Sequence, residues 1–178
     1  MTSTNSVTPI SFAGLTHSGQ YTDNNPYGVA MVAAYVKKSF GDSVDVKLYK
    51  YPTELAADLD KSIPPIICFS GYVWNHRLSY EFARRVKDKS PETIIIFGGP
   101  NFPLIQQEQE SFLREFPLID FFVFREGEIA LTQLLENLFE NDFDVGQVKK
   151  SNLNLQNCYF LHDDKFVSNT HSPAIADL

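Results

Sequence analysis

Two uninterrupted apolar runs constrain the fold of this 178-residue chain more than any other feature. Pro65–Ser70 and Thr93–Phe97 carry apolar residues at consecutive positions, where a half-exposed strand would alternate with polar ones. Such strands are covered on both faces, which is typical of a parallel sheet with helices packed on either side. The segment between them, His76–Ser90, has apolar residues at helical spacing. The three segments therefore predict one right-handed βαβ unit.

The same alternation of strand and helix continues in both directions along the chain. The predicted strands are Ile10–Gly14, Val44–Tyr49, Pro65–Ser70, Thr93–Phe97 and Phe121–Phe124. The predicted helices are Pro26–Gly41, Thr53–Lys61, His76–Ser90, Ile105–Phe116 and Glu128–Glu140. Because short crossovers join elements of this order into parallel strands, we predict an α/β domain with a five-stranded parallel sheet and helices on both faces.

The two ends of the chain differ in character from this central domain, which we place at residues 9–141. Residues 1–8 are polar and are expected to form a disordered lead. In residues 142–178, Cys158–His162 and Lys165–Asn169 flank Asp163-Asp164, which indicates a small β-hairpin. The last residues, Ser172–Leu178, read as an extended linker to a further domain.

Composition excludes several classes of protein. The net charge of −7 leaves no basic excess to neutralise phosphates, which argues against a general nucleic-acid binder. We find neither a secretory signal nor a segment long enough to span a membrane, so we expect a cytoplasmic protein with no membrane contact. The two cysteines, Cys68 and Cys158, are read as buried thiols, with one disulfide as the open alternative.

The loops that follow the strands are the places to look for chemistry, because open parallel sheets bind ligands beyond the carboxyl ends of their strands. Gly98-Gly99-Pro100 leaves one strand with two glycines, which permits close backbone approach to a flat ligand or a phosphate. The alternative is a tight turn with no ligand. The dinucleotide and P-loop glycine patterns are absent, which argues against a nucleotide site.

Two further loops carry candidate residues. In Ser70-Gly71-Tyr72-Val73-Trp74-Asn75, the small residues leave room for a ligand, and Trp74 beside Asn75 either lines a pocket or anchors the next helix in the core. In Arg125-Glu126-Gly127-Glu128, the carboxylates either cap the following helix or are turned by the glycine toward a ligand.

In combination, these three loops resemble the N-terminal cobalamin-binding domain of B12-dependent radical SAM enzymes. That family has a Gly-Gly-Pro turn, then an apolar strand, then Gly-Glu-Gly-Glu or a near variant, and the resemblance covers about Ile10–Phe139. It implies a flavodoxin-like (Rossmann-like) domain that holds cobalamin across its strand ends. The implied cofactor contacts are Ser70, Gly71, Trp74, Asn75, Gly98, Gly99, Pro100 and Glu126.

The resemblance also implies a second domain, a radical SAM barrel whose three-cysteine motif holds a 4Fe-4S cluster and cleaves S-adenosylmethionine. No Cys-x-x-x-Cys-x-x-Cys occurs in this chain. We therefore expect the chain to be a cofactor module rather than an enzyme by itself, with its own radical SAM domain as partner. The alternative is an interaction or scaffold module that keeps the fold without a cofactor.

His17 is the candidate metal ligand. Many cobalamin domains carry Asp-x-His-x-x-Gly after the first strand, with the histidine as lower axial ligand of cobalt. The corresponding segment here is Leu15-Thr16-His17-Ser18-Gly19, in which leucine replaces the aspartate and the glycine comes one position early. The histidine is suitably placed, but position 15 lacks an acceptor for its second nitrogen.

Overall fold

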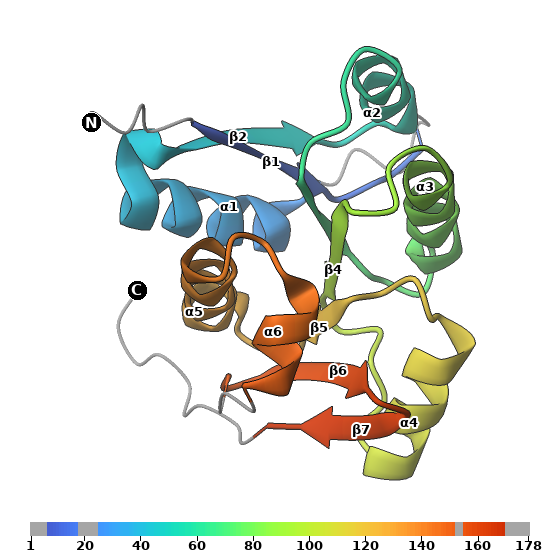
Figure 1. Cartoon of the computed structure of the whole chain (residues 1–178). Helices are drawn as coiled ribbons and strands as arrows, with labels where there is room; N and C mark the ends of the chain where they lie inside the picture. Colours follow the sequence, from blue (N-terminus) through green and yellow to red (C-terminus); the bar gives the residue numbers. More distant parts are fainter. Residues whose placement is uncertain (1–6, 18–24, 152–154, 170–178) are drawn as a thin grey trace, which may run out of the picture.

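A seven-stranded mixed sheet forms the centre of the molecule in a computed structural model that describes residues 7–17, 25–151 and 155–169 (Figure 1). The strands are β1 (Thr8–Ala13), β2 (Val44–Tyr49), β3 (Ile66–Ser70), β4 (Ile94–Gly98), β5 (Phe121–Val123), β6 (Cys158–His162) and β7 (Lys165–Ser168). Their order is β2-β1-β3-β4-β5-β6-β7. Most of the expected lead, together with Gly19 and the expected linker Ser172–Leu178, lies outside the described residues.

The predicted α/β class is confirmed, but the prediction of a purely parallel, five-stranded sheet is wrong. β2, β1, β3, β4 and β5 are parallel, and the C-terminal hairpin extends the same sheet, with β6 antiparallel to β5. The physical reason is burial. Cys158, Tyr159 and Phe160 are at most 2% exposed, and they reach this burial only by pairing beside Phe122 and Val123.

Helices cover both faces of the sheet, as predicted. They are α1 (Tyr27–Phe40), α2 (Pro52–Leu59), α3 (His76–Lys89), α4 (Gln106–Glu115), α5 (Gly127–Glu140) and α6 (Val145–Lys150), with a 3-10 turn η1 (Gly41–Ser43) after α1. Figure 1 shows α1 and α5 on one side of the sheet and α2, α3 and α4 on the other.

Each apolar strand contributes to two separate cores, which explains the uninterrupted runs. Ile66 and Cys68 pack toward α1 and α5, whereas Ile67 and Phe69 pack toward α2 and α3. Successive side chains of a strand point to opposite faces, so a strand covered on both sides needs apolar residues at every position. Burial of each such side chain stabilises the fold by about 1.5–3 kcal/mol.

The short helix α6 was not predicted. Asp144 precedes it, and its carboxylate accepts a hydrogen bond from the backbone N–H of Gln147 at 2.9 Å. Val148 on this helix is buried in the same core as α5. The Asp-x-x-Gln spacing is a helix-start signal that could have revealed α6, although a six-residue helix gives little periodicity.

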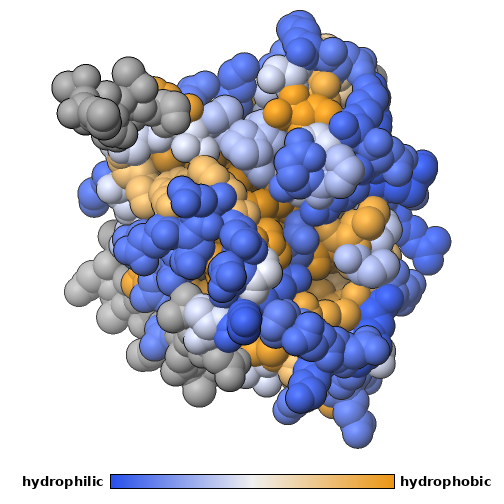
Figure 2. Space-filling model, in the orientation of Figure 1, coloured by the Kyte–Doolittle hydropathy of each residue, from blue (hydrophilic) through white to orange (hydrophobic). Residues whose placement is uncertain are grey.

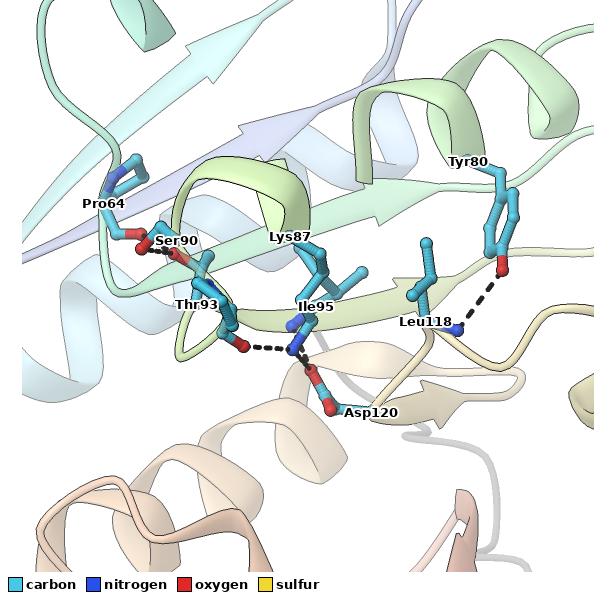
Figure 3. A network of polar contacts seen from close by, with 9 residues as sticks. Pro64, Tyr80, Lys87, Ser90, Thr93, Ile95, Leu118 and Asp120 are labelled. Carbon is cyan, nitrogen blue, oxygen red and sulfur yellow. Dashed lines mark hydrogen bonds and ion pairs between the residues drawn. The ribbon is translucent and has the colours of Figure 1, made fainter. Parts of the chain in front are cut away.

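A polar network connects α3 with the end of the sheet where the parallel strands begin, which we call the amino edge (Figure 3). Asp120 Oδ2 accepts hydrogen bonds from Lys87 Nζ at 2.9 Å and from the backbone N–H of Ile95 at 2.8 Å. Both charged side chains are only 18% exposed. Nearby, Thr93 Oγ1 donates to the carbonyl of Pro64 at 3.2 Å. The amino edge is therefore stabilised by polar groups that have their hydrogen-bond partners within the protein.

The visible surface is largely hydrophilic, with hydrophobic patches between the charged helices (Figure 2). Arg84 on α3, for example, pairs with Glu81 and Asp88, and all three side chains are more than half exposed. Within the described ranges, no helix has both the length and the apolar character that crossing a membrane requires.

Candidate binding site at the carboxyl edge of the sheet

A cavity of about 580 Å³ opens where the parallel strands end, which we call the carboxyl edge. Its buried wall is apolar and comes from the strands β1, β3, β4 and β5 and from the helices α1 and α5. The wall residues are Phe12, Val29, Cys68, Ile96, Val123 and Leu131. An apolar cavity of this size suits an organic ligand, or one part of a larger ligand.

The mouth of the cavity is built from the loops that the sequence singled out. Five predicted contact residues lie together on its lining, namely Ser70, Gly98, Gly99, Pro100 and Glu126. Gly71, Trp74 and Asn75 are not among the lining residues. The topology accounts for the grouping, because β3, β4 and β5 are adjacent parallel strands that end side by side.

Gly71 shapes the mouth indirectly, through contact with the next loop. Its backbone N–H donates to the carbonyl of Gly98 at 2.6 Å, and its carbonyl accepts from the N–H of Asn101 at 3.1 Å. Gly99 has a φ of +105°, and a Cβ at this position would lie 2.8 Å from the Gly71 carbonyl oxygen. Glycine is therefore required at position 99 by both backbone conformation and space.

Asn75 and Trp74 occupy different environments although they are neighbours. Asn75 is 3% exposed; it accepts from the N–H of Tyr72 at 2.7 Å and donates to the carbonyl of Leu15 at 3.0 Å. It thus connects the loops after β1 and β3. Trp74 is 68% exposed and stacks on Tyr72, which lines the cavity. The reading of Trp74 as a core anchor is wrong because the following helix does not cover it.

The loop after β5 forms the opposite side of the mouth. Arg125 lines the cavity with a left-handed φ of 66°, which is uncommon for a residue with a side chain. Glu126 is the N-cap residue of α5, but its side chain makes no capping hydrogen bond. A Cβ on Gly127 would lie 3.1 Å from Val32 Cγ2, so this glycine lets α5 approach α1 closely. Glu128 also lines the cavity and is 9% exposed.

His17 is not among the residues that line the cavity. It is exposed and is the last residue described before residue 25. In the parts of the chain that the structure describes, no group of three or more His, Cys, Asp or Glu side chains could hold a metal ion. Cobalt ligation by His17 stays a prediction.

His76 is buried beneath the mouth. Its ring lies against Phe97, Phe112 and Phe116, and neither ring nitrogen has a hydrogen-bond partner among the described residues. Burial, assisted by the charge of Arg77, lowers the pKa of His76 to about 4. The imidazole is therefore neutral near pH 7. Its Nδ1 would lie 3.2 Å from a Cβ on Gly71.

Sequence reasoning missed most of the buried wall. Phe12, Cys68 and Ile96 could have been found, because they sit at matching positions on adjacent strands and face the same helices. Leu104 gave no local signal, and Arg125 belonged to a loop that was singled out but was not itself predicted as a contact. Both cysteines are free thiols, as predicted, so the disulfide alternative is wrong. Burial raises the pKa of the Cys68 thiol, which therefore contributes as a neutral apolar group.

Comparison with solved structures shows the same fold. The cobalamin-dependent S-adenosylmethionine radical enzyme OxsB with aqua-cobalamin bound superposes with a TM-score of 0.65 at 17% identity, over 96% of this chain and 23% of that one. OxsB with both aqua-cobalamin and S-adenosylmethionine gives a TM-score of 0.64 at 16% identity, with the same coverage of both chains.

Sequence comparison identifies the family. TokK of Streptomyces tokunonensis, a cobalamin-dependent radical SAM methyltransferase, is 33% identical over 72 residues, which are 40% of this chain and 10% of that protein. The 2-(S-pantetheinyl)-carbapenam-3-carboxylate methyltransferase of Streptantibioticus cattleyicolor is 35% identical over 82 residues, 46% of this chain and 11% of that protein. The match thus spans about a tenth of each relative. The profile of the B12 binding domain matches residues 20–135, and the chain belongs to this family.

Proposed function

We propose that this chain is the cobalamin-binding module of a B12-dependent radical SAM enzyme. The observation that carries the proposal is the apolar cavity at the carboxyl edge, whose mouth is formed by glycine-rich loops. The family membership and the cobalamin-bound structural neighbours support it.

The residues at this edge fit the chemistry of cobalamin, which is a broad corrin ring carrying a nucleotide tail. The cavity of about 580 Å³ suits one part of such a molecule. The tail would therefore enter the apolar cavity, and the corrin would lie over the mouth. Gly98 and Gly99 offer a backbone surface without side chains, with Ser70 and Pro100 beside them on the lining. A Cβ at Gly99 would collide with the backbone of Gly71 and disturb this surface.

In the whole enzyme, bound cobalamin would supply a cobalt centre that carries a methyl group or assists a radical reaction. The residues of this chain would bind the cofactor, orient it and exclude water from its tail. The partner would be the enzyme's own radical SAM domain, with its 4Fe-4S cluster and S-adenosylmethionine. Val73, Trp74 and Leu104 are 85%, 68% and 80% exposed close to the mouth, and an apolar surface of this kind favours contact with another domain.

A direct test is retention of corrin by the purified chain. We expect the protein to keep visible corrin absorbance after incubation with hydroxocobalamin and removal of free ligand. If all corrin passes through, this chain alone does not bind cobalamin, and the cofactor-free interaction module becomes the better reading.

A pair of variants on α1 ties binding to the cavity. Gly28 lines the mouth, and a Cβ there would have only the Tyr72 hydroxyl within 4 Å, at 3.6 Å. Gly28→Phe should therefore fold normally and block corrin binding. Ala34→Phe is the matched control, because Ala34 is exposed on the same helix and is not a lining residue. Equal corrin retention by both variants would place the ligand elsewhere.

His17→Ala tests cobalt ligation separately. If the imidazole is an axial ligand, the variant should shift the visible spectrum of the bound corrin. An unchanged spectrum would remove His17 from the site without affecting the rest of the proposal.

A further inference from the structure

Glu128 is a largely buried residue on the cavity lining, and its carboxylate has no hydrogen-bond or ion-pair partner in the described parts of the protein. It is the second residue of α5, it is 9% exposed, and no hydrogen bond or ion pair joins its carboxylate to another described residue. Its backbone carbonyl, in contrast, accepts from Thr132 Oγ1 at 2.9 Å. The backbone carbonyl of Glu128 therefore has a hydrogen-bond donor, whereas its carboxylate has none among the described residues.

The surroundings of Glu128 give its carboxylate no protein donor within the described ranges, so that it faces only the cavity and its solvent. The buried wall of the cavity is apolar, and carboxylates are rarely so buried unless they are paired. Arg125 is the cation on the lining, but its guanidinium lies over the ring of Phe124, 5.6 Å from the centroid. The amino end of α5 provides a favourable dipole, although no backbone N–H donates to the carboxylate.

We propose that Glu128 accepts a hydrogen bond from an N–H or O–H group of the bound ligand and thereby fixes which part of the ligand faces α5. This inference rests on the proposed function, in which the ligand is cobalamin. Cobalamin offers such donors in two places, the amide side chains of the corrin and the hydroxyl groups of the tail ribose. A carboxylate at this position also disfavours ligand variants that present a carboxylate to it.

The test is a titration of Glu128→Ala and Glu128→Gln with hydroxocobalamin, followed by the visible spectrum. Loss of a hydrogen bond to a charged acceptor should weaken binding about tenfold or more in Glu128→Ala. Glu128→Gln keeps an acceptor oxygen without the charge and should lose less. Glu54→Gln is the matched control, since Glu54 is an exposed carboxylate in the first turn of α2. It should bind like the unmodified protein.

A second titration with cobinamide, which lacks the nucleotide tail, distinguishes the two donors. If Glu128→Ala also weakens cobinamide binding, the donor is a corrin amide. If it weakens only cobalamin binding, the donor is a hydroxyl of the tail. Either result supports the inference.

Two outcomes would overturn it. If the unmodified chain binds cobalamin and both Glu128 variants bind within about twofold of it, Glu128 has no such role and the proposed function stands. If the unmodified chain binds neither corrin, the proposed function and this inference both fail. Thermal unfolding without ligand shows whether the variants are folded, and the near-isosteric Glu128→Gln keeps the test valid if Glu128→Ala is not.

Discussion

The two edges of the same sheet differ in how completely their buried polar groups are paired. At the amino edge, Asp120 is paired with Lys87 and with a backbone N–H, and Thr93 donates to a carbonyl. At the carboxyl edge, Asn75 is paired, but both ring nitrogens of His76 are buried without a partner among the described residues, and no hydrogen bond or ion pair holds the Glu128 carboxylate there.

This difference separates the part of the fold that provides stability from the part that meets a ligand. Polar groups that are buried and paired fix the ends of strands at little net cost. Polar groups that are buried and unpaired lower stability, and they are found where a bound ligand can supply the missing hydrogen-bond partner. Substitutions at the amino edge should therefore change stability alone, and those at the carboxyl edge should also change binding.

The largest expected effect is at the amino edge, in Asp120→Ala. The substitution leaves Lys87 Nζ and the N–H of Ile95 without their acceptor in a site that is only 18% exposed. We expect a loss of about 3 kcal/mol in the free energy of unfolding, measured by urea denaturation. Asp88→Ala is the control, because its pair with Arg84 is exposed and should contribute less than about 1 kcal/mol. Equal losses in both variants would contradict the contrast between paired and exposed sites.

His76 should make the stability of the folded protein depend on pH. Its pKa is about 4 in the folded protein and 6.5 without the fold, so the unfolded chain binds the proton first as the pH falls. The stability of the folded state is then complete above about pH 6.5 and declines toward pH 4, by about 3 kcal/mol for this group.

His76→Phe removes this titration while keeping an aromatic ring among Phe97, Phe112 and Phe116. Urea denaturation between pH 7 and pH 4 should show a shallower decline in the variant than in the unmodified chain. Carboxylates titrate in both proteins and cancel in the difference. Identical slopes would show that the folded structure accepts the proton at His76 without penalty.

Gly99→Ala should disturb both stability and binding. A φ of +105° and a contact of 2.8 Å with the Gly71 carbonyl leave no room for a methyl group. We expect a loss of about 2 kcal/mol in stability, together with weaker corrin retention. Gly28→Ala is the control with the opposite sign, because this glycine in the first turn of α1 has space for a Cβ and alanine favours the helix by up to about 1 kcal/mol. A stable Gly99→Ala variant that binds normally would refute the role given to this turn.

The smallest effect is expected for Arg114→Ala, also at the amino edge. Arg114 reaches the hairpin turn, where its guanidinium donates to the carbonyl of Asp164 at 2.6 Å and pairs with its carboxylate at 3.1 Å. Asp164 is 96% exposed, so the pair should contribute less than about 1 kcal/mol. Hydrogen exchange of the β7 amides should remain slow. Fast exchange would mean that this contact, rather than strand pairing, holds the hairpin in place.

The local sequence predicted those elements whose apolar pattern can be buried in only one arrangement. Val44–Tyr49 and Cys158–His162 match the observed strands, β3 differs from its predicted range by one residue at its start, and β4 differs by one residue at each end. The pairing of Val123 with Cys158 was not predictable, because it joins distant segments and depends on which sheet edge is open. The glycine turn of the site was found by its composition. The burial of His76 was not, since Phe112 and Phe116 come from another helix.

The pairing of the hairpin with β5 has a consequence for attempts to shorten the protein. β5 has three residues, and its outer backbone groups are satisfied by β6. A chain cut after Glu140, at the apparent end of the βα alternation, would expose this strand beside Phe121 and Val123. An open, apolar strand edge is a template for pairing with other molecules. Such a truncated protein would aggregate, so the smallest usable unit extends through Ser168.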